Sequence, residues 1–317
     1  MELIIQNGDN IYIPLVEDSI IWKTERRGCA GQLDFSVLDD GNIKIEEGNA
    51  VRFKVGDSNI FYGFIFTLKR DKENIISVTA YDQLRYLKNK DTYVYTNKTA
   101  GEFLKMIAED FELKCGEIED TGFKIQSRIE ENTTLFDMVQ NALDITLENK
   151  KEMYVLYDDF GKIALKNISS MSLDILIDEE TAENFDYSSS IDSDTYNKIK
   201  LTFDNDSTGK RDVYISQDGN NINKWGILQY FDTLKEGENG KAKADALLSL
   251  YNQKTKTLSL KNAFGDVRVR GGSMVMVRLN FGDVKLNNFM IVEKCKHEFK
   301  NDEHFMELNL RGGVVNA

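Results

Sequence analysis

The residues best suited to metal or nucleophilic chemistry lie near the C-terminus, where Cys295 and His297 are two positions apart. On a β-strand such a spacing places both side chains on one face. A zinc site needs a second pair of ligands at suitable spacing, and the chain, whose only other histidine is His304, has none. We therefore expect a sheet surface without a metal. Cys295 is also the only cysteine close in sequence to a histidine, so it is the one candidate thiol nucleophile.

A second candidate, Asp204–Gly209, imitates the opening of a calcium-binding loop. The twelfth position of such a loop is a glutamate that binds with both oxygens, whereas here it is Ile215. Strand-like sequence flanks the stretch on both sides. A polar hairpin turn is therefore the better interpretation.

Other catalytic patterns are missing or weak. There is no Gly-x-Ser-x-Gly elbow, and Gly271-Gly272 lacks the lysine of a phosphate-binding loop. Glycosidase chemistry needs two carboxylates held across a groove, but the adjacent acids lie in turn-like contexts at Glu46-Glu47, Asp158-Asp159 and Glu179-Glu180. We assign no catalytic, cofactor-binding or metal residue, and we expect neither a cofactor nor enzymatic activity. A carbohydrate-active or cell-wall-binding β protein stays open as the alternative, because 13 Tyr and 18 Phe offer a groove lining.

Composition narrows the classes of partner. With 317 residues the chain can form two or three domains with real cores, and its net charge of −13 disfavours a protein that grasps nucleic acid. The same acidity would suit a conduit past which DNA slides, although solubility alone also explains it. No apolar run approaches the roughly 20 residues of a membrane helix, and the start lacks a signal-peptide pattern. Three widely spaced cysteines favour folding in a reducing cytoplasm without disulfides.

The predicted strands, which must position any functional site, form a pattern that occurs twice in the sequence. Three runs of alternating apolar and polar residues, separated by turn residues, occur near each end of the chain. These runs are Gly48–Val55, Tyr62–Arg70 and Ile75–Tyr81, and then Gly272–Leu279, Asn288–Cys295 and His304–Arg311. Two related three-stranded meanders in one chain indicate two similar modules.

Between the modules the pattern changes to helical spacing. Asp82 is a plausible cap for a short helix with Leu84 and Leu87 on one face, Thr99–Glu102 is a capping box, and Thr134–Asp137 opens a second helix. A hairpin follows, with strands at Met153–Tyr157 and Lys162–Leu165.

The predicted fold is α+β and β-rich, with two similar antiparallel β-barrels, or strongly curled sheets, and an intervening small α+β domain. The N-terminal β-barrel module is 1–90 and the domain with two helices and a hairpin is 91–170. The second β-barrel module is 171–317, acidic and irregular over Leu173–Asp194, with strands near Asn197–Phe203, Asp212–Ser216 and Trp225–Phe231. A helical excursion near 241–254 would lie over this barrel or cap its end.

Apolar residues occupy both faces of the meander strands. Phe64 and Phe66 share one face while Ile65 lies on the other, and Met274, Met276, Phe289 and Ile291 behave similarly. Two apolar faces favour assembly with neighbouring subunits. An internal sandwich with both faces covered is the alternative.

The order of these segments resembles a known family. The stretches Thr79–Leu87, Thr99–Ala108 and Glu131–Gln140, followed by a late β-module, are similar to the contractile-tail baseplate hub family: phage late-control protein D-like proteins and the hub-like tail protein of the defective Bacillus prophage. The resemblance covers essentially the whole chain. The related spike of a type VI secretion system is disfavoured, because no C-terminal β-helix repeat is present.

The resemblance implies a virion structural protein of a contractile phage tail or tail-like bacteriocin. Each chain would supply two tube-type barrels, so that a homotrimer forms a ring of six modules that adapts a sixfold tail tube to a threefold spike. Implied partners are the tail tube protein, the central spike and other baseplate proteins, with the tape-measure protein as a further candidate. DNA would be only passing cargo, and no stable membrane association is expected. The protein would assemble in the bacterial host cytoplasm and end in the virion or tail-particle baseplate.

Overall fold

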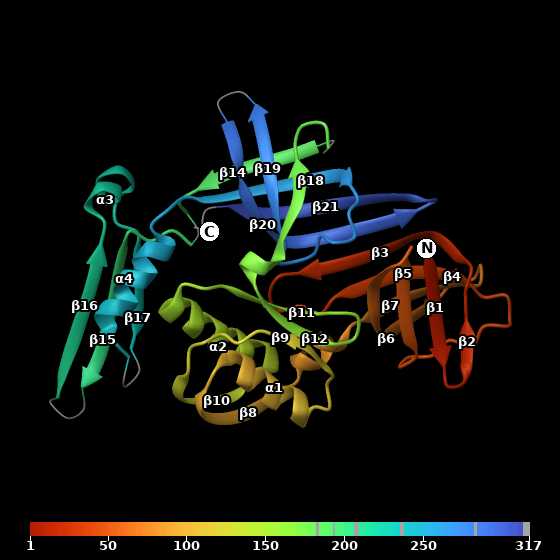
Figure 1. Ribbon diagram of the computed structural model, residues 1–317, viewed down its shortest axis with the longest axis horizontal. Coiled ribbons are helices and arrows are strands. Elements are labelled where there is room, and N and C mark those ends of the chain that lie inside the picture. The colour runs from red at the N-terminus through yellow and green to blue at the C-terminus, as the bar shows by residue number, and fades with distance from the viewer. Residues whose placement is uncertain (182–183, 193, 206–208, 235–237, 282–283, 313–317) are drawn as a thin grey trace.

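A computed structural model of the chain describes residues 1–181, 184–192, 194–205, 209–234, 238–281 and 284–312. Strands predominate, as the alternating sequence predicts, and thirteen of those described form one mainly antiparallel sheet. In Figure 1 the N-terminal strands lie at the right, the C-terminal strands along the top, the helices α1 and α2 at the bottom and a separate small sheet at the left. The helices of the described residues are too short or too polar to span a lipid bilayer.

The N-terminal half of the large sheet contains seven strands in the order β2-β1-β5-β6-β7-β4-β3. Apolar residues alternate along them, as in Gln32–Leu38, where Leu33, Phe35 and Val37 are buried. The strands are β1 (Glu2–Asn7), β2 (Asn10–Tyr12), β3 (Val16–Glu25), β4 (Gln32–Leu38), β5 (Ala50–Val55), β6 (Ser58–Arg70) and β7 (Ile75–Tyr81).

The apolar side chains on one face of these strands pack against one another and form a core. This core gathers side chains from both sides of the strand order, including Ile5 of β1 and Trp22 of β3, together with the fully buried Phe53 of β5. No helical residue belongs to this core among those described. A sheet that buries one face without a covering layer must curl, because only its own strands can exclude water from that face.

The C-terminal half repeats this arrangement. Its strand order β13-β19-β20-β21-β18-β14 matches β1-β5-β6-β7-β4-β3 position for position, and matched strands follow one another identically along the chain. The pairing of β13 with β19 is parallel where β1 and β5 are antiparallel. The strands are β13 (Ser172–Ile177), β14 (Asn184–Ser190), β18 (Thr255–Phe264), β19 (Met274–Phe281), β20 (Val284–Lys300) and β21 (Glu303–Gly312).

Two expectations for this half need correction. The stretch Leu173–Asp194 is not irregular, since it supplies most of β13 and the whole of β14. The strand pairings of the described residues also leave both halves open, so two closed barrels are not confirmed. Instead β20 pairs with β3, from Lys294 opposite Glu25 to Phe299 opposite Ile20, and this ladder joins the two halves into one sheet.

The α+β segment packs its own core beside this sheet. Asp82 caps the 3₁₀ helix η1, and the predicted capping box of Thr99 with Glu102 and the Thr134 cap are confirmed. Buried residues Phe103, Leu104 and Ile107 of α1 meet α2 and two small sheets. The elements are η1 (Gln83–Lys88), β8 (Lys90–Lys98), α1 (Ala100–Asp110), β9 (Cys115–Ile118), β10 (Ile125–Thr134), α2 (Leu135–Lys150), β11 (Tyr154–Asp158), β12 (Ile163–Asn167) and η2 (Ile168–Met171).

Between β14 and β18 the chain leaves the large sheet and forms an insertion. The strands β16-β15-β17 make a separate three-stranded sheet, and α4 packs on it through Ala244 and Leu247. The predicted helix near 241–254 exists, but it neither crosses nor caps a barrel, because its apolar face covers this sheet. The elements are β15 (Lys198–Asn205), β16 (Lys210–Gln217), α3 (Gly219–Trp225), β17 (Gln229–Thr233) and α4 (Gly240–Tyr251).

Candidate functional site

Cys295 and His297 do lie side by side, but inside the protein rather than on a sheet surface. The Cys295 Sγ atom is 3.0 Å from His297 Nε2, and the imidazole stacks on Trp22. Burial raises the pKa of the Cys295 thiol and lowers the pKa of His297 to about 3. A buried thiol that stays protonated cannot act as a nucleophile, so the pair is part of the core.

The neutral imidazole is held by its neighbours. His297 Nε2 lies 2.8 Å from the Val269 carbonyl oxygen, which can only accept, so Nε2 carries the proton. His297 Nδ1 then accepts from His304 Nε2 at 2.8 Å. Among the described residues, no group of three or more His, Cys, Asp and Glu side chains is placed to hold a metal ion.

The carboxylate pairs are not brought together into a groove. Glu46 and Glu47 are exposed in a loop, and Glu179 accepts a hydrogen bond from the Asn280 backbone at 2.7 Å. Asp158 is buried, whereas its neighbour Asp159 is exposed. Part of the Asp204–Gly209 stretch, residues 206–208, lies outside the described residues.

The aromatic face at Phe64 and Phe66 is largely used within the chain. Phe66 packs edge-on against Tyr81, and both phenylalanines contact Tyr86 of η1. Arg85 lies over the Phe66 ring at 5.3 Å. This face is therefore half-buried by the start of the α+β segment and is not an open assembly surface.

Both halves of the large sheet and the α+β segment meet at one place, which we call the junction. Arg26, just after β3, is almost fully buried and donates hydrogen bonds of 2.9 Å from Nε and Nη2 to the two carboxylate oxygens of Glu293 on β20. Its Nη1 atom lies 3.7 Å from Met153 Sδ, before β11. One side chain thus touches all three parts of the fold.

Arg270 connects the same three parts from the loop before β19. Its guanidinium lies 4.2 Å from the centre of the Tyr157 ring and 5.8 Å from that of Trp22. Nη2 donates a 3.0 Å hydrogen bond to the Asp158 carbonyl oxygen. The next residue, Gly271, donates its backbone N–H to Thr24 Oγ1 at 2.9 Å.

Two buried carboxyl groups face this arginine. Burial raises the pKa of Asp158 to about 6, against the opposing effects of the Gly161 N–H and Arg270. Burial, and then the Asp158 charge, raise the pKa of Asp82 well above its usual value. Asp82 nevertheless has a structural task, because its Oδ2 accepts the Gly31 N–H at 2.8 Å while its Oδ1 caps η1.

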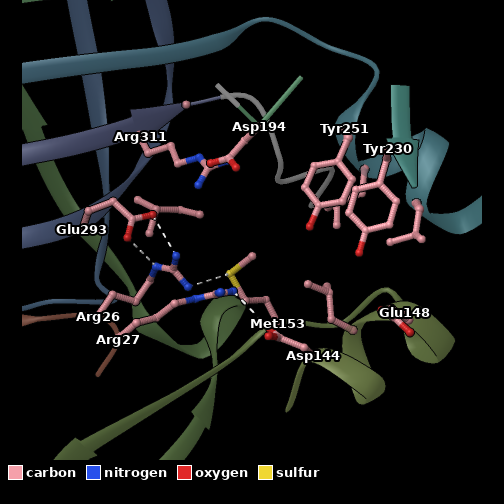
Figure 2. Close-up of a pocket in the computed structure, with 15 residues that line it drawn as sticks. Arg26, Arg27, Asp144, Glu148, Met153, Asp194, Tyr230, Tyr251, Glu293 and Arg311 are labelled. Atoms are coloured by element: carbon pink, nitrogen blue, oxygen red, sulfur yellow. Dashed lines mark hydrogen bonds and ion pairs between the residues drawn. The ribbon is translucent and has the colours of Figure 1, made fainter. Parts of the chain in front are cut away.

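A cavity of about 250 Å³ lies between this junction and the insertion (Figure 2). Arg27 faces Asp144 across 3.5 Å and Arg311 faces Asp194 across 3.6 Å, so the charges in its wall are matched. Tyr230 and Tyr251 stack at its far side with ring centres 6.0 Å apart. Burial raises the pKa of Tyr230 to about 12, so its hydroxyl stays neutral.

The interactions at this junction connect the three parts of the fold. Its arginines are paired with carboxylates, carbonyls or aromatic faces, and its acidic groups serve as caps and acceptors. Sequence reasoning missed Arg26 and Arg270. The available signal was the placement of Arg26-Arg27-Gly28 and Arg270-Gly271-Gly272, two arginine–glycine runs at strand ends, where chain segments can approach closely.

Comparison with known proteins fits this architecture. The YQBQ-like family model matches residues 20–311, which includes the junction and both halves of the large sheet. The chain belongs to the YQBQ-like family. It is 31% identical over 311 residues to the uncharacterized protein YqbQ of Bacillus subtilis strain 168, covering 94% of this chain and 93% of YqbQ.

A second relative of this YQBQ-like chain is the phage-like element PBSX protein XkdQ of the same organism. It is 29% identical over 314 residues, covering 95% of this chain and 94% of XkdQ. The expected resemblance to a protein of a defective Bacillus prophage is thereby confirmed.

A solved structure has the same fold. The prophage MuSo2 43 kDa tail protein of Shewanella oneidensis matches this chain with a TM-score of 0.71 over 98% of each chain, at 12% identity. At that identity the match shows a shared fold, which is that of a phage tail protein.

Proposed function

We propose that this YQBQ-like protein is a structural, non-enzymatic component of a phage-type tail: the baseplate hub, which forms a trimeric ring. The observation that carries the proposal is the repeated strand order, β1-β5-β6-β7-β4-β3 and β13-β19-β20-β21-β18-β14. Two equivalent modules per chain give a trimer six similar positions. Such a ring can meet sixfold symmetry on one side and threefold symmetry on the other.

In this proposal the chain divides at about 90 and 170 into two tube-type modules and the α+β domain between them. Arg26 and Arg270 hold these parts in a fixed orientation, since each touches all three. A fixed orientation is needed because the two modules of each chain can occupy quasi-equivalent positions in a ring only if the angle between them is the same in every chain. The open edges of the curled modules would be covered by neighbouring modules in the ring.

The relatives support the setting. XkdQ belongs to a phage-like element and the Shewanella oneidensis protein is a prophage tail protein. We therefore propose assembly in the bacterial host cytoplasm and a final place in the baseplate of a contractile phage tail or tail-like bacteriocin. The partners would be the tube protein, the central spike and other baseplate proteins, with the tape-measure protein as a further contact. DNA would pass through the ring, whose net charge of −13 per chain disfavours its retention.

The mass of the purified protein in solution tests the proposal. Light scattering should give about 109 kDa, which is three times the 36.3 kDa of one chain. A single species of 36.3 kDa at high concentration would count against the ring. Turnover of peptidoglycan or another glycan by the pure protein would contradict the non-enzymatic part of the proposal.

A further inference from the structure

The insertion leaves apolar side chains exposed on one face of its three-stranded sheet, although Thr202 on the middle strand of that face is buried. The other face of the sheet is covered by α4, whereas Val213, Ile215 and Phe231 project from the uncovered face, with Phe231 55% exposed. In the strand registers Ile215 and Phe231 flank Lys200, and Val213 flanks Thr202. The exposed Val213, Ile215 and Phe231 and the half-exposed Lys200 form a patch, which we name the insertion face.

The insertion face is also basic. Lys198 and Lys200 lie on it, and neither makes an ion pair within the described part of the chain; Lys200 Nζ lies 6.0 Å from the centre of the Phe231 ring. Among the described residues, Asp204 is the acidic side chain of this face, and it is already paired with Arg211. The face therefore offers exposed apolar surface beside two half-exposed lysines that have no ion-pair partner among the described residues.

A patch of opposite character lies at the other end of the molecule. Ile11, Ile13 and Leu15 alternate along β2 and the segment after it, and Ile13 is 75% exposed. The same segment, residues 9–18, contains Asp9, Glu17 and Asp18 and no lysine or arginine. We name it the N-terminal strip; it belongs to the module at the right of Figure 1, whereas the insertion lies at the left.

The N-terminal strip is better suited to contacts through its side chains than to backbone pairing with another strand. β2 is the last strand at its end of the large sheet, where another strand would ordinarily pair. Pro14 interrupts the segment, and a proline cannot donate to a ladder. Of the strip's acids, Asp18 is paired with Lys300, while Glu17 has no ion pair among the described residues. An apolar strip with acidic side chains is complementary to an apolar face with lysine side chains.

We propose that the insertion face of one copy of this chain docks on the N-terminal strip of the next copy. A contact between two different patches on identical chains is head-to-tail, and repeated copies form a closed ring when the rotation between neighbours is one third of a turn. This inference rests on the proposed trimer and specifies the contact that builds it. The acidic flanks of the strip and the lysines of the face would set the register between neighbours.

Light scattering over a range of concentrations, with matched variants, tests the contact. Phe231→Glu should raise the concentration at which half of the protein is assembled by at least about tenfold, because it puts a charge at the centre of the patch. Lys200→Glu and Glu17→Lys should each weaken assembly, and the double variant should restore it. Ile129→Glu is the control, since Ile129 is 64% exposed on β10, outside both patches, and should leave assembly unchanged.

Each result separates this contact from the proposed ring. A wild-type trimer that persists unchanged in Phe231→Glu, or a double charge variant no better than the singles, would overturn the contact and leave the hub standing. Equal loss in Ile129→Glu would also overturn it, because the effect would not belong to the patch. A wild-type protein that stays monomeric throughout would overturn both the trimer and this contact. Circular dichroism of every variant should show the wild-type spectrum.

Discussion

The carboxylate of Glu293 accepts both hydrogen bonds of a bidentate pair from Arg26, each 2.9 Å long, although 267 residues separate the two in sequence. The backbone continues the link, because the Arg26 N–H donates to the Glu293 carbonyl oxygen at 2.9 Å. The pair closes the end of the β3–β20 ladder, where the two similar halves of the sheet meet. Arg26 thus extends the β3–β20 ladder by one further contact between the two similar halves.

Removing one partner of this pair should be costly. Arg26→Ala leaves the Glu293 carboxylate facing a half-buried junction, so we expect the free energy of unfolding to fall by about 3 kcal/mol. Urea denaturation followed by fluorescence measures it. The control is Lys294→Ala, which breaks an exposed ion pair with Glu25 and should cost less than about 1 kcal/mol. Equal losses in the two variants would contradict the role of Arg26.

The buried carboxyl of Asp158 predicts a pH effect. Its pKa is about 6 in the fold and close to 3.8 in the unfolded chain, so the fold binds its proton more tightly. The contribution of Asp158 to the free energy of unfolding is therefore complete below pH 4 and is lost as the pH rises through 6. Relative to Asp158→Asn, the wild type should lose about 2–3 kcal/mol of stability between pH 4 and pH 7.

Denaturant unfolding at several pH values measures this difference. The matched control is Asp159→Asn, at the exposed neighbouring carboxyl. A constant gap between wild type and Asp158→Asn across this range would show that Asp158 ionises in the fold as it does in the unfolded chain.

The imidazole of His297 predicts the opposite trend. Burial lowers its pKa to about 3, so only the unfolded chain takes up the proton between pH 6.5 and 3. Stability from this group is present above pH 6.5, and about 2 kcal/mol of it should be lost by pH 5. Nuclear magnetic resonance gives the direct check: the ring signals of His297 should not shift between pH 5 and 8. A titration midpoint near 6.5 would refute the buried neutral imidazole.

Gly271 should not tolerate a side chain. A Cβ atom there would lie 2.4 Å from the backbone carbon of Glu25 and 2.6 Å from the Arg26 nitrogen, so Ala must push the loop away from β3. We expect Gly271→Ala to lower the free energy of unfolding by about 3 kcal/mol, the upper part of the range for overpacking. Gly219→Ala is the control, since a Cβ atom there meets nothing within 4 Å. Comparable stability of the two variants would contradict the close approach.

Local signals predicted the local structure. The hydroxyl of Thr99 and the carboxylate of Glu102 form the capping box that their spacing indicates, and alternation found the strands of both meanders. These features depend on residues only a few positions apart, so the sequence carries them directly.

Non-local pairings were beyond such signals. The alternation of apolar and polar residues indicates which face of a strand is buried, but it does not identify the strands that pair with it. The β3–β20 ladder could therefore not be predicted from Trp22 and His297 alone. For the same reason Ile199 and Leu201 looked like strands of the second module, although their buried face meets α4 in a separate sheet. Arg26 and Arg270 were missed because an arginine's partner is set by the tertiary fold.

The central claim, a ring with two equivalent modules per chain, is tested most directly by electron microscopy of the purified protein. Class averages viewed along the ring axis should show threefold symmetry with six similar densities around a central opening. Rings with three densities, or particles without rotational symmetry at concentrations where light scattering reports assembly, would contradict it.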